Sequence, residues 1–315
     1  MLMVYFKRMK QGGANRFSAG FTIVETLIVL AITGVMLLSV IGLVSGKQNK
    51  TEFQQGINDA VTQLQQTARE VAIGYYPGLT DCSVAGSSLS FHGSDESGQG
   101  TNNNCVFLGK VVQFGVLADG SAASVGGGTN ERYPAYTLAG CQFKSCSTNA
   151  SSPVSTSFAD AKPMVVERTS AVVAAHNFPT GVTNWYTLEN GLSTVSMSYT
   201  CDATLDPNCP GTGANPTRAF GFLQSFGTYG CNGGLCSGSQ HANLYGINVP
   251  SAGDTNLTKD QVLSAIDTNA THLVQAQKVT ICLRSGTTNQ SGLLTIGSNT
   301  NSVSVKIFDG GSCGA

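Results

Sequence analysis

The sequence has few charged residues, few histidines and a single tryptophan. Only 11% of its 315 residues are charged, whereas glycine alone accounts for 38, and serine, threonine and asparagine occur throughout. The four histidines are scattered, and none lies in a nucleophile elbow, an HExxH motif or a phosphate-binding loop: His92, His176, His241 and His272. This composition is unlike that of a cytoplasmic enzyme and is typical of a loop-rich extracellular β protein.

Charge is sparsest between Phe21 and Val44. This run of 24 residues contains one charged side chain, Glu25. A helix of this length measures roughly 36 Å and can cross a hydrocarbon core. A carboxylate costs about 2.5 to 3.5 kcal/mol at the centre of a spanning helix and less near the interface, and such residues usually have a function and a partner. The run predicts a membrane anchor in which Glu25 has a role; the structural alternative places Glu25 at headgroup depth.

The 20 residues before the anchor lack acidic side chains. They end in Ala19-Gly20 and contain four basic residues: Lys7, Arg8, Lys10 and Arg16. A secretory signal places its small-residue cleavage site after the apolar region, whereas here the small residues precede it. Cleavage at Gly20 would therefore remove the basic leader and leave the anchor on the product. The leader's charge predicts that it lies on the cytoplasmic side, with the C-terminal bulk outside.

The mature chain would be acidic. Removal of the leader takes four of the 17 lysines and arginines and leaves 13 against 18 acidic residues, a formal charge of −5. Binding to nucleic acid depends on neutralising phosphates with basic side chains. This balance disfavours a general nucleic-acid binder.

The stretch Gly20-Phe21-Thr22-Ile23-Val24-Glu25-Thr26-Leu27-Ile28-Val29 resembles the type IV prepilin signature, which pilins share with the pseudopilins of type II secretion. The resemblance implies cleavage between Gly20 and Phe21 by a prepilin peptidase on the cytoplasmic face, and N-methylation of Phe21. It also implies that Glu25 pairs with the amino terminus of a neighbouring subunit in an apolar filament core. Such pairing is physically sensible because an uncompensated buried charge is costly and a paired one specifies register.

The resemblance covers residues 16 to about 75, with one departure. Many major pilins have a proline in the second half of the spanning helix, but this chain has none between Phe21 and Tyr76. Gly34 and Gly42 are the candidates to loosen the helix instead, because each weakens a helix interior by about 1 kcal/mol relative to alanine.

The helix is predicted to continue beyond the membrane. Apolar residues recur at spacings of 4, 4, 3, 4 and 3 and form one stripe: Phe53, Ile57, Val61, Leu64, Ala68 and Val71. Glycine and proline end the pattern at Gly74-Tyr75-Tyr76-Pro77-Gly78. A helix from Phe21 to about Ile73 would be roughly 80 Å long. We expect its second half to lie against the globular domain; a coiled-coil stalk is the alternative.

These patterns divide the chain into four parts: a leader at 1–20, a spanning or filament-core helix at 21–44, an extension of that helix at 45–74, and a disulfide-rich, β-rich globular domain at 75–315. A long helix followed by an antiparallel sheet is an α+β arrangement, here of pilin-like type. Short β-like runs between polar clusters predict strands at 105–117, 162–175, 194–200, 218–226, 244–249, 278–284, 292–296 and 302–308, of which the first is either a hairpin or a bent strand.

One further helix is predicted near the C-terminus. Thr258 and Gln261 have capping-box spacing, and Leu257 can pack onto Val262 as a hydrophobic staple. This helix would run to about Gln275. The closing segments, 279–284 and 307–313, also resemble the C-terminal region of minor pseudopilins and minor pilins.

Ten cysteines fall into sequence neighbours: Cys82 with Cys105, Cys141 with Cys146, Cys201 with Cys209, Cys231 with Cys236, and Cys282 with Cys313. An exported domain with few charges can use disulfides to restrain long loops, so we predict these pairs, although many other connectivities exist. The alternative is a zinc site formed by Cys141, Cys146, Cys231 and Cys236. Neither pair has CxxC spacing, and an oxidising compartment disfavours free thiolates.

Other ligand sites have weaker signals. Asp202, Asp206 and Asn208 offer oxygen atoms of the kind that calcium prefers, and a disulfide-closed loop without an ion is the alternative. The glycine runs at 126–128 and 233–234 are expected to be turns in polar loops. Trp185 is either a surface recognition residue or a packed one.

The sequence therefore predicts a structural subunit of a type IV pilus-like filament, without catalytic, cofactor or metal residues. Its role would be adhesion, motility or DNA uptake, and its partners other pilin subunits, the prepilin peptidase, the membrane and an unproven surface ligand or DNA. The precursor would be a single-pass membrane protein, and the assembled subunit part of a surface filament. One alternative is a type II secretion pseudopilin; another is an enzyme or solute-binding module with an uncleaved signal-anchor.

Overall fold

A computed structural model describes most of the chain. The described residues are 22–74, 82–85, 88–91, 105–117, 121–123, 131–147, 149, 151–165, 184–211, 213–224, 242–249, 257–268, 272–297, 302–310 and 312–313. The chain divides into two compact units, Met1–Gln48 and Asn49–Ala315.

The first element is a long helix, α1 (Ile23–Ala72), which agrees closely with the helix predicted from Phe21 to Ile73. The other described elements are β1 (Cys82–Ala85), β2 (Ser88–Phe91), β3 (Cys105–Gln113), β4 (Arg132–Cys141), η1 (Lys144–Cys146), α2 (Phe158–Ala161), β5 (Met164–Val165), β6 (Asn184–Thr187), β7 (Leu192–Cys201), β8 (Asn215–Pro216), β9 (Ala219–Gln224), β10 (Ala242–Ile247), α4 (Lys259–Thr268), β11 (Leu273–Ser285), β12 (Gln290–Gly297) and β13 (Val303–Asp309).

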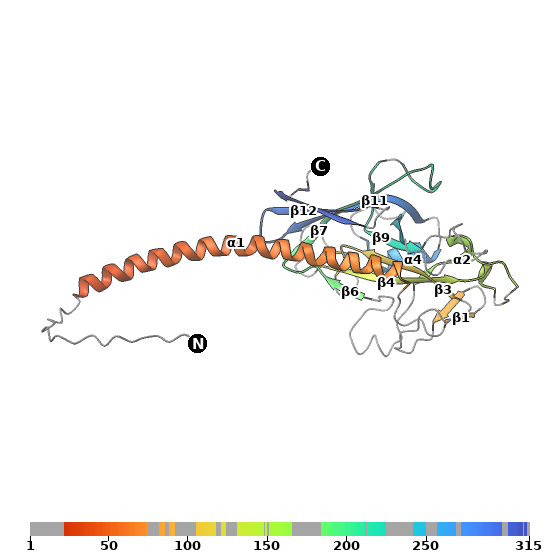
Figure 1. The fold of residues 1–315 in the computed structure, drawn as a ribbon, viewed down its shortest axis with the longest axis horizontal. Helices are drawn as coiled ribbons and strands as arrows, with labels where there is room; N and C mark the ends of the chain where they lie inside the picture. The colour runs from red at the N-terminus through yellow and green to blue at the C-terminus, as the bar shows by residue number, and fades with distance from the viewer. Residues whose placement is uncertain are drawn as a thin grey trace, which may run out of the picture. The chain divides into compact units, whose positions relative to one another are not determined.

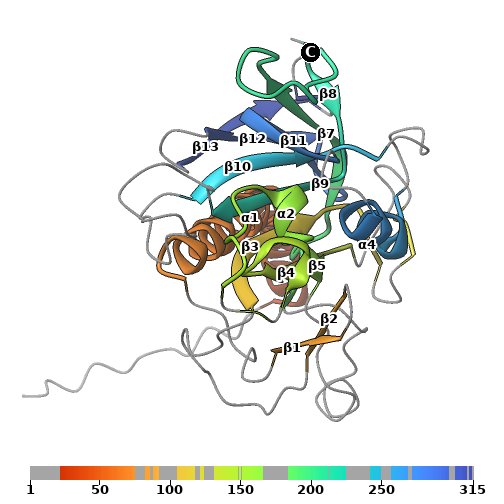
Figure 2. The same cartoon turned by 90° about the vertical axis from the view of Figure 1, so that its right-hand side faces the viewer.

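Eleven strands form one antiparallel sheet, so the fold is α+β with an N-terminal helix. The main strand order is β13-β12-β11-β10-β9-β3-β4-β5. Figure 2 shows the strands in this order, from blue β13 to yellow-green β4 and β5. β6 pairs with β4, and β7 pairs with both β11 and β8, while β1 and β2 form a separate hairpin.

The apolar stripe of α1 forms the centre of the larger core, as its spacing predicts. Phe53, Ile57, Leu64 and Val71 are each at most 1% exposed, and Val61 packs at the margin of the same cluster. Their partners come from β3, β4, β7 and β9 to β12, so this part of α1 lies along one face of the sheet (Figure 1). A second core forms on the opposite face, where Val262 and Ile266 of α4 pack on β3, β4 and β10.

Glycine permits close approach between α1 and the sheet. A Cβ atom on Gly292 of β12 would lie 2.3 Å from the Cδ1 atom of Ile57, and one on Gly56 would lie 2.8 Å from a methyl carbon of Leu192. Distances this short are below van der Waals contact, so side chains at these positions would push the helix away.

The structure changes the end of one predicted strand and the beginning of another. The predicted strand 105–117 ends at Gln113, and only an isolated bridge at Val116 continues its pairing. It is a bent strand, one of the two expected forms: a bulge lies between Phe107 and Gly109, where Gly109 has a φ of 137° and a Cβ atom would lie 2.2 Å from the carbonyl oxygen of Phe222. The predicted strand 162–175 begins later than expected, because Lys162 is the C-cap of α2 and the strand pairing starts with β5 at Met164; residues 166–175 lie outside the described residues and stay a prediction.

The C-terminal helix is shorter than predicted. Its capping box is present: the Thr258 N–H donates to Oε1 of Gln261 at 2.9 Å, and the Gln261 N–H donates to the Thr258 hydroxyl at 3.3 Å. However, α4 ends at Thr268, and Leu273 to Gln275 already belong to β11. Pairing with β10 determines where β11 begins. The local sequence pattern does not predict this boundary, because the partner strand lies about 30 residues away.

Strand β4 was not predicted; it is the next-to-last strand of the main order and pairs with β3 on one side and with the short strands β5 and β6 on the other. Nine of its ten residues are buried, so it has no alternation of apolar and polar side chains. Pro134 also argues against a central strand. In the structure Pro134 lies beyond the residues that pair with β3 and opposite Trp185 of β6, so it interrupts no pairing with β3.

Candidate functional site

The first turn of α1 holds the predicted assembly residue, Glu25. The Thr22 side-chain oxygen accepts a hydrogen bond from the Glu25 backbone N–H at 3.3 Å, and the Thr22 carbonyl accepts from the Thr26 N–H at 3.2 Å. Thr22 is therefore the N-cap of the helix. The spacing of Thr22 and Glu25 is that of a capping box, a sequence signal that could have identified Thr22 beforehand. Gly20 and Phe21 lie outside the described residues, so cleavage and methylation there stay predictions.

The apolar part of α1 is exposed along its length within the first unit. Every side chain from Thr22 to Ile41 is exposed, and Ile23–Ile41 is the one helix among the described residues that is long and apolar enough to cross a membrane. Its hydroxyl groups bond within the helix: Thr26, Thr33 and Ser39 donate to carbonyls three or four residues earlier, at 2.8 to 2.9 Å. An exposed apolar helix with internally satisfied polar groups is suited to lipid or to packing against other helices.

Two polar contacts join the rest of α1 to the sheet. The Lys110 ammonium group of β3 is fully buried and forms an ion pair with Glu70 of α1, whose side chain is 14% exposed. The Tyr133 hydroxyl of β4 donates to the Gln63 side chain of α1. A buried ion pair contributes less to net stability than to the choice of one register, because a shifted helix would leave the lysine uncompensated.

A buried carboxylate lies where β4, β7 and β9 begin. Glu131 accepts the Gly115 N–H at 3.0 Å with one oxygen and the Thr194 N–H at 2.8 Å with the other. Burial raises the pKa of Glu131, although these hydrogen bonds and the Arg218 guanidinium act in the opposite direction. Burial also lowers the pKa of Arg218, which is 3% exposed. Glu131 thus links three segments that are distant in the sequence.

Three of the five predicted disulfides are present in the described residues: Cys141–Cys146, Cys201–Cys209 and Cys282–Cys313. The Cys141–Cys146 bond contradicts the zinc alternative for this pair, because zinc needs free thiolates. Cys82 lies in β1 and Cys105 in β3, with side chains that are not described, and Cys231 and Cys236 lie outside the described residues. Both of these pairings stay predictions.

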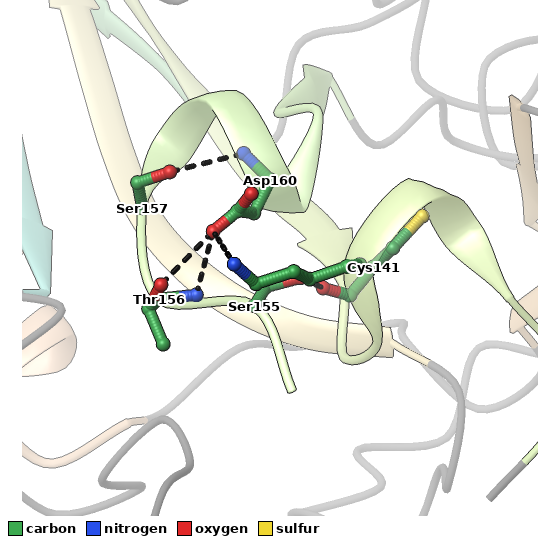
Figure 3. Close-up of polar contacts among 6 residues, drawn as sticks. Cys141, Ser155, Thr156, Ser157 and Asp160 are labelled. Atoms are coloured by element: carbon green, nitrogen blue, oxygen red, sulfur yellow. Dashed lines mark hydrogen bonds and ion pairs between the residues drawn. The ribbon is translucent and has the colours of Figure 1, made fainter. Parts of the chain in front are cut away.

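The Cys141–Cys146 loop is held against α2 by a polar cluster (Figure 3). Asp160 accepts hydrogen bonds from the Thr156 N–H at 3.1 Å and hydroxyl at 3.0 Å, and pairs with the Lys144 ammonium at 3.3 Å. The Ser157 hydroxyl caps α2 by accepting the Asp160 N–H at 3.1 Å. Partial burial raises the pKa of Asp160, but the hydrogen bonds outweigh it and hold the pKa below its usual value. The cluster therefore holds the loop in place, and the Asp160 carboxylate is occupied by these contacts within the protein.

The proposed calcium-binding oxygens also accept hydrogen bonds within the protein. Asp202 accepts from the Thr204 N–H at 2.8 Å and hydroxyl at 2.7 Å, whereas Asp206 accepts from the N–H groups of Asn208 at 2.9 Å and Gln275 at 2.7 Å. No group of three metal-binding side chains is found among the described residues. These carboxylates therefore shape the Cys201–Cys209 loop and tie it to β11.

Of the remaining candidates, the structure describes the contacts of His272 alone. His272 has its Nδ1 atom 2.8 Å from the carbonyl oxygen of Ala265 at the end of α4. Trp185 lies in β6, and its side chain is not described. Three histidines and both glycine runs lie outside the described residues: His92, His176, His241, 126–128 and 233–234.

Comparison with known proteins gives one match. Residues 15–41 match the family described as the prokaryotic N-terminal methylation motif, which is the class III signal peptide of type IV pilins. The match spans the predicted cleavage site, Phe21, Glu25 and the apolar part of α1. No curated protein and no solved structure matches the chain with significant similarity.

Proposed function

We propose that this type IV pilin-like protein is a structural subunit of a pilus-like filament and displays its globular domain at the cell surface. The motif is that of a pilin-type precursor, which is anchored in the membrane, processed by a prepilin peptidase and assembled with other pilin subunits. One observation carries the proposal. The methylation motif leads directly into an exposed apolar helix with one carboxylate in its first turn.

In the proposed filament, the exposed residues of α1 pack against the same segment of other subunits. Glu25 compensates the amino terminus of a neighbour, because neither charge is stable alone in an apolar core. The globular domain then supplies adhesion, motility or DNA uptake, and the formal charge of −5 favours a role other than general DNA binding.

Mass spectrometry of the N-terminal peptide from surface protein tests the processing step. We expect a methylated peptide that begins at Phe21. A bulky substitution, Gly20→Phe, should block cleavage because the peptidase needs a small residue there. An intact leader on the wild-type protein would instead support a signal-anchored enzyme or binding module.

The assembly role of Glu25 has its own test. Glu25→Gln should be cleaved like the wild type but should be lost from the filament fraction, because the subunit amino terminus then lacks its counter-charge. Asp59→Asn removes an exposed carboxylate from the same helix and should assemble normally. Normal incorporation of Glu25→Gln would refute the role.

The cellular location of the filament separates the two pilin-like alternatives. A pilus subunit should appear in filaments sheared from the cell surface. A type II secretion pseudopilin should stay in the envelope, and its deletion should abolish secretion of exported enzymes.

A further inference from the structure

The outer edge of β13 has no partner strand among the residues that the structure describes. Among the described residues β13 pairs with β12 alone, and it ends the strand order of the sheet. Side chains 304–307 are exposed, with 37% of Val305 and 40% of Ile307 accessible. After Gly310 the chain turns back toward the sheet interior, where Cys313 bonds to Cys282 of β11 and Ser291 of β12 donates to the carbonyl of Ser312 at 2.9 Å. The described tail residues, 312 and 313, therefore lie on β11 and β12 and not along this edge.

The edge combines free backbone groups with an apolar face. Val303 packs against the main core, and strand alternation places Val305 and Ile307 on the same face. Lys306 lies on the opposite face, with its ammonium group 5.0 Å from the centre of the Phe308 ring. Natural edge strands usually carry proline, bulges or inward charges that prevent pairing. β13 has regular pairing with β12 over seven residues, and the one charge on its apolar face is Asp309 at the end of the strand, which accepts a hydrogen bond from the Gln290 side chain at 3.1 Å.

We propose that β13 pairs antiparallel with β13 of a second copy of this chain, centred on Val305. In this register each Val305 faces its counterpart, Val303 faces Ile307, and Lys306 faces Ser304. Apolar side chains thus meet apolar ones on one face, and on the other face each lysine meets a hydroxyl group. A register centred on Lys306 would instead place two lysines directly opposite each other, which is destabilising. Residues 303–307 are therefore complementary to the same residues of a second copy, which is why we assign a second copy of this chain as the partner of the edge.

The symmetry of this pair determines which copies can meet. A two-fold axis normal to the sheet reverses every direction in its plane, including that of the α1 segment along its face. The pair therefore joins domains presented from opposite directions, as in two filaments that lie side by side. A seven-residue edge buries less area than a stable dimer needs, so a single contact is weak. If many such contacts repeat along two filaments, their combined binding is much stronger than that of one contact; this consequence rests on the proposed function.

Cysteine cross-linking tests the register on the mature full-length chain in detergent micelles. Val305→Cys should give a disulfide-linked dimer, whereas Val303→Cys and Ile307→Cys should each remain at the level of Leu205→Cys. Leu205 is 62% exposed and lies outside β13, so it gives the background rate. A mixture of the Val303→Cys and Ile307→Cys proteins should cross-link again, because these positions face each other.

Sedimentation over a concentration series gives a measurement without added thiols. The wild-type chain should show a concentration-dependent dimer that Val305→Lys abolishes and Leu205→Lys retains. The proposal is overturned if Val305→Cys links no faster than Leu205→Cys, or if the dimer survives Val305→Lys. Neither result bears on filament assembly, because polymerisation is not measured.

Discussion

At the scale of single residues, the buried charges select one arrangement of helix and sheet. Lys110 is completely buried in β3, and the ion pair with Glu70 is its compensation. Tyr133 and Gln63 make a second contact nearer the start of the same helical segment. Apolar packing alone tolerates small shifts, whereas a buried lysine does not. These residues therefore determine where α1 sits on the sheet.

We predict that Glu70→Gln destabilises the globular unit by about 3 to 5 kcal/mol, because it leaves the Lys110 charge buried without a partner. The double variant Lys110→Met with Glu70→Leu should be more stable than Glu70→Gln, since it removes both charges. Urea unfolding followed by circular dichroism measures both effects. Glu189→Gln, at an exposed position, is the control and should change little. Equal stability of Glu70→Gln and the wild type would show that the lysine finds another partner.

At the scale of elements, glycine residues set the distance between α1 and the strands beneath it. Gly292 lies under Ile57, and Gly56 lies against Leu192. The sequence predicts the apolar stripe of α1 but not these glycines, because the use of each depends on an element more than 100 residues away. The same limit applies to β4, whose buried position removes the alternation by which a strand is predicted.

We predict that Gly292→Ala destabilises the fold by about 1 to 3 kcal/mol through overpacking against the Cδ1 atom of Ile57. Ile57→Val removes that atom and should cost about 0.5 to 1.5 kcal/mol alone. The double variant should lose less stability than the sum of the losses of the two single variants, because the new methyl group occupies the space that the Cδ1 atom of Ile57 leaves. Thermal or urea unfolding of the four proteins gives the coupling.

Gly297→Ala is the matched control for this cycle. It lies in the same strand, and a Cβ atom there would meet nothing within 4 Å. A similar loss of stability in Gly297→Ala and Gly292→Ala would mean that strand flexibility, rather than contact with α1, explains the effect.

At the scale of the whole molecule, disulfides restrain a chain rich in polar loops. The three described bonds close loops with sequence separations of 5, 8 and 31 residues. The entropy that a cross-link removes from the unfolded chain grows with the logarithm of loop length. The bond between Cys282 and Cys313 also joins β11 to the segment after β13, so it holds the C-terminal end against the sheet.

We predict that replacing Cys282 and Cys313 with alanine destabilises the fold by about 3 to 4 kcal/mol, whereas replacing Cys141 and Cys146 costs about 2 kcal/mol. The loss is larger for Cys282 and Cys313 because their bond closes the longer loop. Denaturant unfolding of the two double variants under oxidising conditions measures it. A larger loss from the Cys141 and Cys146 variant would show that the native contacts of that loop, such as those around Asp160, outweigh the entropy of closure.

The sequence alone determined the features that depend on local pattern. The basic leader, the uncharged run with Glu25, the helical stripe, the α4 capping box and three nearest-neighbour disulfides all follow from residues within a few turns or one loop of each other. The tertiary structure alone decided what depends on distant partners: the burial of Lys110 opposite Glu70, the burial of β4 between β3 and the strands β5 and β6, the end of α4 at Thr268 and, among the described residues, the unpaired edge of β13. Pairing between strands creates these features, and a strand's environment is set by neighbours that its own sequence does not specify.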